Sequence, residues 1–195
     1  MAYNLQDQEQ IDELKAFWAN NGNRLMWLAV IALAVFAGWR AWNWYHDGQA
    51  QDAAREYAGL VSAADSGKIE QVRERYDAIQ KGYGSSVYAG MAGLRAAEAF
   101  AKANQPDAAV AALENVMKNS TEPGFKPIAG VRLAGLLLDQ KKYGEATKAI
   151  DSGNIGPVSG EMAASVADRR GDILAAQGKA SDAKAAWEEI GRAHV

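Results

Sequence analysis

Apolar residues form one unbroken run near the start of the chain and short, helically spaced groups after it. The fifteen residues from Leu25 to Trp39 carry no charge, and they would cover every side of a helix. Extended to Trp44, the run has twenty residues, and a helix of that length spans roughly 30 Å, the thickness of a bilayer core. The pattern predicts one transmembrane helix over residues 25–45.

Side chains suited to a membrane surface stand at both ends of this run. Indole and phenol rings prefer the half-apolar interface, and an arginine near a helix end can extend its guanidinium to the headgroups. We therefore expect these membrane-interface anchors: Trp27 at one end, and Trp39, Arg40, Trp42, Trp44 and Tyr45 at the other.

A buried core helix and a cleavable signal peptide are the alternatives to a retained anchor. A core helix would not be apolar on every side, and a signal peptide begins with a short basic segment. Here the preceding segment is long and holds four acidic residues, Asp7, Glu9, Asp12 and Glu13. The sequence therefore favours a retained anchor. It leaves the orientation open, because two basic residues flank the span on each side: Lys15 and Arg24 before it, Arg40 and Arg55 after it.

Residues 1–24 form an amphipathic tail. The apolar residues Leu5, Ile11, Leu14, Phe17 and Trp18 fall on one face of a helix. Such a helix lies on the bilayer surface or docks on a partner protein. The polar run at residues 20–23, Asn-Asn-Gly-Asn, predicts a break before the membrane span.

From Gly48 onward the chain repeats with a period of 37 residues. Three kinds of position recur in the first half of each unit: arginines at 95, 132 and 169, small residues at 97, 134 and 171, and bulky residues at 100, 137 and 174. After turns at Asn104, Lys141 and Gly178 follow Ala109, Ala146 and Ala183, then Leu113, Ile150 and Trp187. One period earlier, Gly67-Lys68, Val72 and Tyr76 stand at matching places, so about four units fill residues 48–195.

Each unit is predicted to be a pair of helices, because small residues on one helix face bulky residues on the next. The pattern resembles the tetratricopeptide repeat, whose usual period is about 34. In this chain the period is longer, which indicates a longer loop between units, and the proline that usually ends each unit is not in register. Unrelated alanine-rich hairpins are the alternative. The predicted fold class is all-α: one transmembrane helix followed by a tetratricopeptide-like α-solenoid. We expect Trp187 to pack inside the last hairpin.

The composition excludes several kinds of chemistry. The chain has no cysteine, two distant histidines and a net charge of −3, which argues against thiolate metal sites and nucleic-acid binding. It has no Walker loop, nucleophile elbow, HExxH or dinucleotide motif, and the segment Gly153 to Gly160 is predicted to be a loop. His46 beside Asp47 is read as an interfacial residue. We expect no enzyme activity, no cofactor, no metal and no small-molecule substrate.

The recurring arginines Arg95, Arg132 and Arg169 are the candidate partner-binding residues. Stacking of the units would bring them into a line, where guanidinium groups could bind carbonyls or carboxylates of an extended peptide. Salt bridges to Glu98, Asp168 or Asp172 are the structural alternative.

The order of tail, span and divergent repeats resembles the YfgM family, ancillary subunits of the bacterial SecYEG translocon. Residues 9–18, EQIDELKAFW, give the closest likeness, and Gly38-Trp39-Arg40, residues 168–172 and residues 185–188 also fit. The resemblance implies an inner-membrane protein with a cytoplasmic tail and periplasmic repeats. It also implies partners: a SecYEG-type translocon, and periplasmic chaperones that receive secretory proteins.

A membrane-tethered scaffold or regulator of another envelope complex is the alternative function, and an enzyme or enzyme accessory subunit is a third. The final residues Ile190 to Val195 resemble the translation of a sequencing-adapter oligonucleotide. We therefore expect the last unit to be truncated.

Overall fold

The structure is a computed structural model that describes residues 3–193, and it leaves out the side chains of 3–14, 41–48 and 191–193. Nine helices and no strand occur in the described part, so the all-α prediction is confirmed. The chain divides into two compact units, Met1–Gly48 and Gln49–Val195. Helix α1 (Tyr3–Asp65) contributes residues to both.

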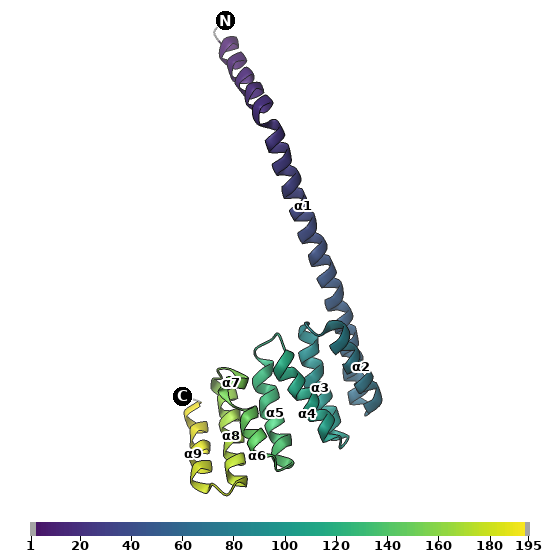
Figure 1. Ribbon diagram of the computed structural model, residues 1–195, viewed down its shortest axis with the longest axis vertical. Helices are drawn as coiled ribbons and strands as arrows, with labels where there is room; N and C mark the ends of the chain where they lie inside the picture. Colours follow the sequence, from purple (N-terminus) through teal and green to yellow (C-terminus); the bar gives the residue numbers. More distant parts are fainter. Residues whose placement is uncertain (1–2, 194–195) are drawn as a thin grey trace. The chain divides into compact units, whose positions relative to one another are not determined.

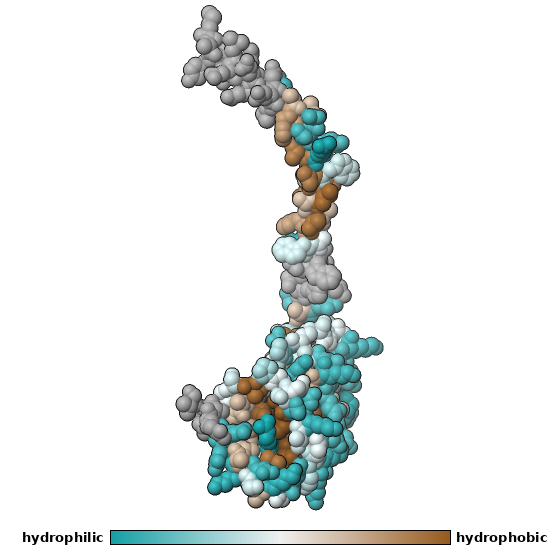
Figure 2. Space-filling view, turned by 60° about the vertical axis from the view of Figure 1, so that its left-hand side comes forward, coloured by the Kyte–Doolittle hydropathy of each residue, from teal (hydrophilic) through white to brown (hydrophobic). Residues whose placement is uncertain are grey.

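The first unit contains the apolar stretch of α1. Lys15–Arg40 is the one helical segment of the described residues that is long and apolar enough to cross a membrane. Only 6% of its most apolar part is buried, so the alternative of a core helix is wrong. Large apolar side chains such as Leu33 and Val35, each 67% exposed, cover its surface (Figure 2).

The predicted break at residues 20–23 is wrong, because α1 continues through them. Asn21 keeps its amide on the helix: Nδ2 donates to the Phe17 carbonyl at 3.3 Å. The indole of Trp18 lies over Gly22, 3.4 Å from where a Cβ atom would stand. Contacts within the helix thus offset the weak helix propensity of asparagine and glycine.

The second unit is a series of helical hairpins stacked side by side (Figure 1). The end of α1 pairs with α2 (Ile69–Tyr83), α3 (Val87–Lys102) with α4 (Pro106–Asn119), α5 (Phe125–Asp139) with α6 (Tyr143–Ala149), and α8 (Gly160–Ala176) with α9 (Ala180–Ala193). The short α7 (Ser152–Ile155) follows α6. The predicted helical repeats are therefore confirmed.

The four hairpin turns share one backbone design. In each turn an amide donates to a carbonyl five residues earlier: Lys68 to Ala63, Gln105 to Phe100, Lys142 to Leu137 and Lys179 to Leu174, at 2.9, 2.8, 2.8 and 3.0 Å. The residue before each donor has a positive φ: 67° at Gly67, 56° at Asn104, 60° at Lys141 and 78° at Gly178. These features form a Schellman cap, which satisfies the last carbonyls of the first helix. All four caps lie 37 residues apart.

The core follows the predicted alternation of small and bulky positions. Ala97 and Ala134 are buried at 3% and 0% exposure, and the bulky Leu113 of α4 and Ile150, the residue directly after α6, are each 1% exposed. In the last unit the buried bulky residue is Ile173, at 1% exposure, whereas Leu174 at the predicted position is only half-buried.

Trp187 packs within its hairpin but is not enclosed there. Its indole lies directly over Gly171, where a Cβ atom would come within 2.2 Å of Nε1. The residue is nevertheless 40% exposed. The predicted neighbour of Trp187 is therefore correct, but the residue is less buried than predicted. Because the indole buries less apolar surface than a fully enclosed one, removing it should cost less stability.

The third unit departs from the repeat after its turn. Helix α6 has 7 residues, half as many as the 14 of α4. Asp151 then caps α7, where Oδ1 accepts from the Gly153 amide at 2.8 Å. The segment predicted as a loop, Gly153 to Gly160, therefore begins within a helical turn. Gly130 of α5 admits this corner, because a Cβ atom there would lie 2.5 Å from the Ala149 carbonyl oxygen.

Replacing Lys141 with glycine is expected to raise the stability of the repeat domain. Lysine in the left-handed region is strained, and glycine relieves that strain while adding freedom to the unfolded chain. We expect a net gain of about 1 kcal/mol, measured by denaturant unfolding of the full chain in detergent. Lys142→Gly is the control, since Lys142 has a negative φ of −86°. An equal gain from both variants would contradict the assignment of strain to Lys141.

Replacing Gly130 with alanine is expected to destabilise the third unit. The new methyl group would press on a backbone carbonyl that cannot rotate away, at a cost of about 1–3 kcal/mol. Gly135→Ala on the same helix is the control, because its Cβ atom would meet only the Arg169 side chain at 3.5 Å. That change should be neutral or stabilising, by up to about 1 kcal/mol. Thermal melting of both variants decides the matter, and equal melting temperatures would refute the close contact.

Candidate partner-binding surface

The three recurring arginines all lie on the first helices of successive units. Arg95 is on α3, Arg132 on α5 and Arg169 on α8. Each of them reaches back toward the preceding first helix, where it meets Asp65, the Leu94 carbonyl and Gly135, respectively. The row therefore joins neighbouring units along one face, which we call the first-helix face.

Arg95 is held by two carboxylates. Its Nη1 donates to Glu98 Oε2 at 2.8 Å, and its Nη2 contacts Asp65 Oδ1. The hydrogen bond to Glu98 is the main reason that the pKa of Arg95 rises. The pKa of Glu98 falls, chiefly because Lys102 Nζ donates to it at 2.6 Å and secondarily because of Arg95. The network therefore stabilises the fold above pH 4.5, and the contribution is lost as the pH falls through the lowered pKa.

Arg132 lacks the carboxylate that its counterparts have. The residue three positions after each arginine is Glu98, Gly135 and Asp172 in turn, so only the middle arginine has no acidic neighbour there. Arg132 is exposed, and Nη1 makes one long hydrogen bond of 3.4 Å to the Leu94 carbonyl. The 37-residue alignment thus also identifies Arg132 as the one of the three arginines whose guanidinium forms no ion pair with the described residues.

Arg169 occupies the space that Gly135 leaves. Its guanidinium carbon lies 3.5 Å from where a Gly135 Cβ atom would stand, and Nη1 pairs with Asp172 Oδ2 at 3.0 Å. Its Nε is buried and has no hydrogen-bond partner in the described part of the chain. The guanidinium therefore keeps one donor that no protein acceptor satisfies.

Two hollows of equivalent register open on the first-helix face. The larger, about 450 Å³, is lined by the end of α1, the start of α2, and α3, and it has Arg95, Ala99 and Lys102 along one side. The other, about 430 Å³, lies one unit further on, with Arg132, Leu136 and Asp139 at the corresponding positions and Arg169 from the next unit. Alanines line both hollows, so each offers an apolar floor with a charged edge. The two hollows differ in charge at one equivalent position, where the first has Lys102 and the second has Asp139.

Sequence reasoning found the arginines but missed these hollows. The alanines that line them fit the general composition of the helices, so no single residue signals the site. A comparison of positions three residues after each arginine could have separated the free arginine from the paired ones.

The predicted membrane-interface anchors are described only in part. Trp27 and Trp39 are 62% and 58% exposed, and Arg40 is exposed as well. The side chains of Trp42, Trp44, Tyr45 and His46 lie outside the described part, as do those of residues 191–193 and the whole of residues 194–195. Among the described residues there is no group of three or more His, Cys, Asp or Glu that could hold a metal ion.

These observations define a helical-repeat protein with one candidate membrane span. The family model of the tetratricopeptide repeat-like domain matches residues 15–193. This repeat is a protein-interaction fold, whose stacked helices offer an extended surface. The chain belongs to this domain family and to the family of ancillary SecYEG translocon subunits, as the curated relatives show.

The relatives align over nearly the whole chain. The protein named "Ancillary SecYEG translocon subunit" from Escherichia coli (strain K12) is 29% identical over 185 residues, or 93% of this chain and 85% of that protein. The protein of the same name from Neisseria gonorrhoeae is 30% identical over 94% of this chain and 86% of that protein. The one from Haemophilus influenzae is 26% identical over 97% and 90%. No solved structure matches the chain significantly.

Truncating the arginines singly should separate structural from available guanidinium groups. Arg95→Ala removes a side chain that is 23% exposed and joins two carboxylates, and we expect a loss of about 1 kcal/mol or less. Arg132→Ala removes one long hydrogen bond and should stay within about 0.5 kcal/mol of the parent. Thermal melting in detergent measures both. If Arg132→Ala melts as early as Arg95→Ala, Arg132 is structural after all.

Proposed function

We propose that this protein is an ancillary subunit of a SecYEG-type translocon, anchored in the bacterial inner membrane by the apolar stretch of α1. The tail lies in the cytoplasm and the repeat domain in the periplasm. There the repeat domain receives segments of secretory proteins and passes them to periplasmic chaperones. Family membership supports the translocon as partner, because the curated relatives carry that name.

The first-helix face is the observation that supports peptide binding most directly. Three positions on one side of its two hollows lie 37 residues apart, so an extended segment crossing the helices meets an apolar floor and a charged edge twice. Arg132 and Arg169 both edge the second hollow, and the exposed Arg132 makes one long hydrogen bond within the protein, which leaves it donors for a ligand. Carbonyl oxygens and carboxylates of a peptide would satisfy these donors.

A membrane-tethered scaffold or regulator of another envelope complex is the second candidate. The same anchor and the same repeat face would serve it, since the fold alone does not choose a partner. The identity of the proteins recovered with the chain distinguishes the two.

Co-purification in mild detergent, from cells with native expression levels, tests the proposal. The parent chain should recover translocon subunits together with a periplasmic chaperone. The double variant Arg132→Ala/Arg169→Ala should keep its melting temperature within a few degrees and recover less chaperone and secretory protein. The matched control is Arg75→Ala/Arg170→Ala, because these arginines pair with Glu56 and Glu189 and line neither hollow.

Recovery of a different envelope complex without translocon subunits would favour the scaffold alternative. Unchanged recovery by the Arg132→Ala/Arg169→Ala variant would reject the role of the first-helix face and leave the translocon association to the rest of the chain.

A further inference from the structure

The second helices of neighbouring units leave a gap between them, which polar side chains close at one place. Between α2 and α4, Asn115 Nδ2 donates to Tyr76 Oη at 3.1 Å and to Gln80 Oε1 at 2.8 Å. Gln80 Nε2 in turn donates to the Ala89 carbonyl at 2.9 Å. In the next gap, no side-chain hydrogen bond or ion pair joins the described residues of α4 to those of α6 or α7.

The 37-residue register explains why the second gap stays open. The positions of Tyr76 and Gln80 are taken by Leu113 and Met117, which cannot form such hydrogen bonds. The position of Asn115 is taken by Ser152, which lies in α7 because α6 ends at Ala149. The residues that would bridge the helices are therefore either apolar or displaced from the helix.

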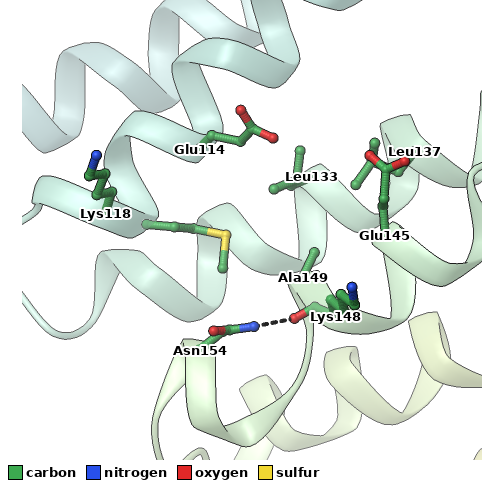
Figure 3. Close-up of a pocket in the computed structure, with 9 residues that line it drawn as sticks. Glu114, Lys118, Leu133, Leu137, Glu145, Lys148, Ala149 and Asn154 are labelled. Atoms are coloured by element: carbon green, nitrogen blue, oxygen red, sulfur yellow. Dashed lines mark hydrogen bonds between the residues drawn. The ribbon is translucent and has the colours of Figure 1, made fainter.

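The open gap is a hollow of about 370 Å³ (Figure 3). Leu133 and Leu137 of α5 form its floor, with Met117 and Ala149 beside them. Asn154 Nδ2 donates to the Lys148 carbonyl at 2.6 Å, which holds α7 against the end of α6 and fixes one edge. The volume falls at the lower end of the usual range for binding pockets, about 300–1,000 Å³.

Four exposed charges surround this apolar floor. Glu114 and Lys118 stand on α4, and Glu145 and Lys148 on α6. Their side chains make no ion pair with the described residues, unlike the networks of the first-helix face. In Figure 3, Glu114 and Lys148 lie on opposite sides of Leu133. On both helices the acidic residue precedes the basic one.

We infer that this gap, lined by Leu133, Leu137 and Met117 and edged by Glu114 and Lys118, docks an amphipathic helix of a partner protein that runs antiparallel to α4. A groove between two helices with an apolar floor accommodates the apolar face of a third. An antiparallel helix with the order Glu-x-x-x-Lys places lysine opposite Glu114 and glutamate opposite Lys118. Within the partner helix, a glutamate four residues before a lysine also forms a stabilising i,i+4 ion pair, which is more favourable than the reverse order. The site is separate from the first-helix face and does not depend on the proposed function.

Two synthetic helical peptides of identical composition test this inference with the full chain in detergent. Each is about 18 residues long, which exceeds the roughly 12–15 residues that an isolated helix needs. Each carries leucines at i, i+3, i+4 and i+7 and a fluorescein label. One has Glu-x-x-x-Lys on both flanks of the leucine stripe, and the other has every Glu and Lys exchanged. Fluorescence anisotropy measures their affinities.

The parent chain should bind the Glu-first peptide saturably and the exchanged peptide about tenfold more weakly, since like charges face each other when the exchanged peptide runs antiparallel to α4. The variant Glu114→Lys/Lys118→Glu should reverse this preference. Met117→Gln should weaken both peptides while the melting temperature is kept. Lys184→Glu/Glu188→Lys, an exchange of the two charges at an exposed i,i+4 pair of α9, is the matched control and should change nothing.

Other outcomes overturn the inference. Absence of saturable binding by either peptide, or a preference that the α4 exchange leaves unchanged, excludes a helix in this gap. Light scattering of the same samples tests for a second copy of the chain as the occupant. If the parent chain is a dimer that the α4 exchange or the peptide converts to a monomer, the occupant is another copy and not a partner protein.

Discussion

Every hairpin of the repeat domain reverses through one residue held in the left-handed region of the backbone. The two amides at that residue and the next bond to carbonyls of the first helix, and the following residues begin the second helix at once. The second helix then starts at a fixed rotation relative to the first. Val72, Ala109, Ala146 and Ala183, which all occupy one register, are consequently all buried. The fixed turn is therefore what places small and bulky residues opposite each other in every unit.

This constraint explains which features the sequence could predict. The period of 37 located the turns and most of the core, because turn and core residues must recur wherever the backbone does. It could not locate the end of α6, which depends on the close approach of Gly130 to Ala149 and on the Asp151 cap. The prediction of a helix break at residues 20–23 was wrong for a related reason. The low helix propensity of these residues has less effect than the contacts of Trp18 and Asn21 within a long helix.

The candidate binding residues were predictable as a row but not as a site. Equal spacing placed Arg95, Arg132 and Arg169 on one face, yet their engagement differs because of the residue three positions on. Glu98 and Asp172 bind their arginines, whereas Gly135 leaves Arg132 without a carboxylate and gives Arg169 room to lie across α5. The salt-bridge alternative therefore holds for Arg95 and Arg169. Peptide binding stays a prediction, and Arg132 is the one of the three arginines without an ion pair in the described part of the chain.

The same reasoning extends to the opposite side of the domain. A strictly repeated backbone would present equivalent gaps, so what distinguishes one gap from another must come from side chains or backbone segments that break the repeat. Tyr76, Gln80 and Asn115 close the gap between α2 and α4, while Leu113, Met117 and the displaced Ser152 leave the next one open. The turns are alike in every unit, so the difference between the two gaps comes from these side chains and from the early end of α6 at Ala149. Specific surfaces in this fold thus arise where the side-chain pattern departs from the repeat, and in the third unit the backbone departs from it as well.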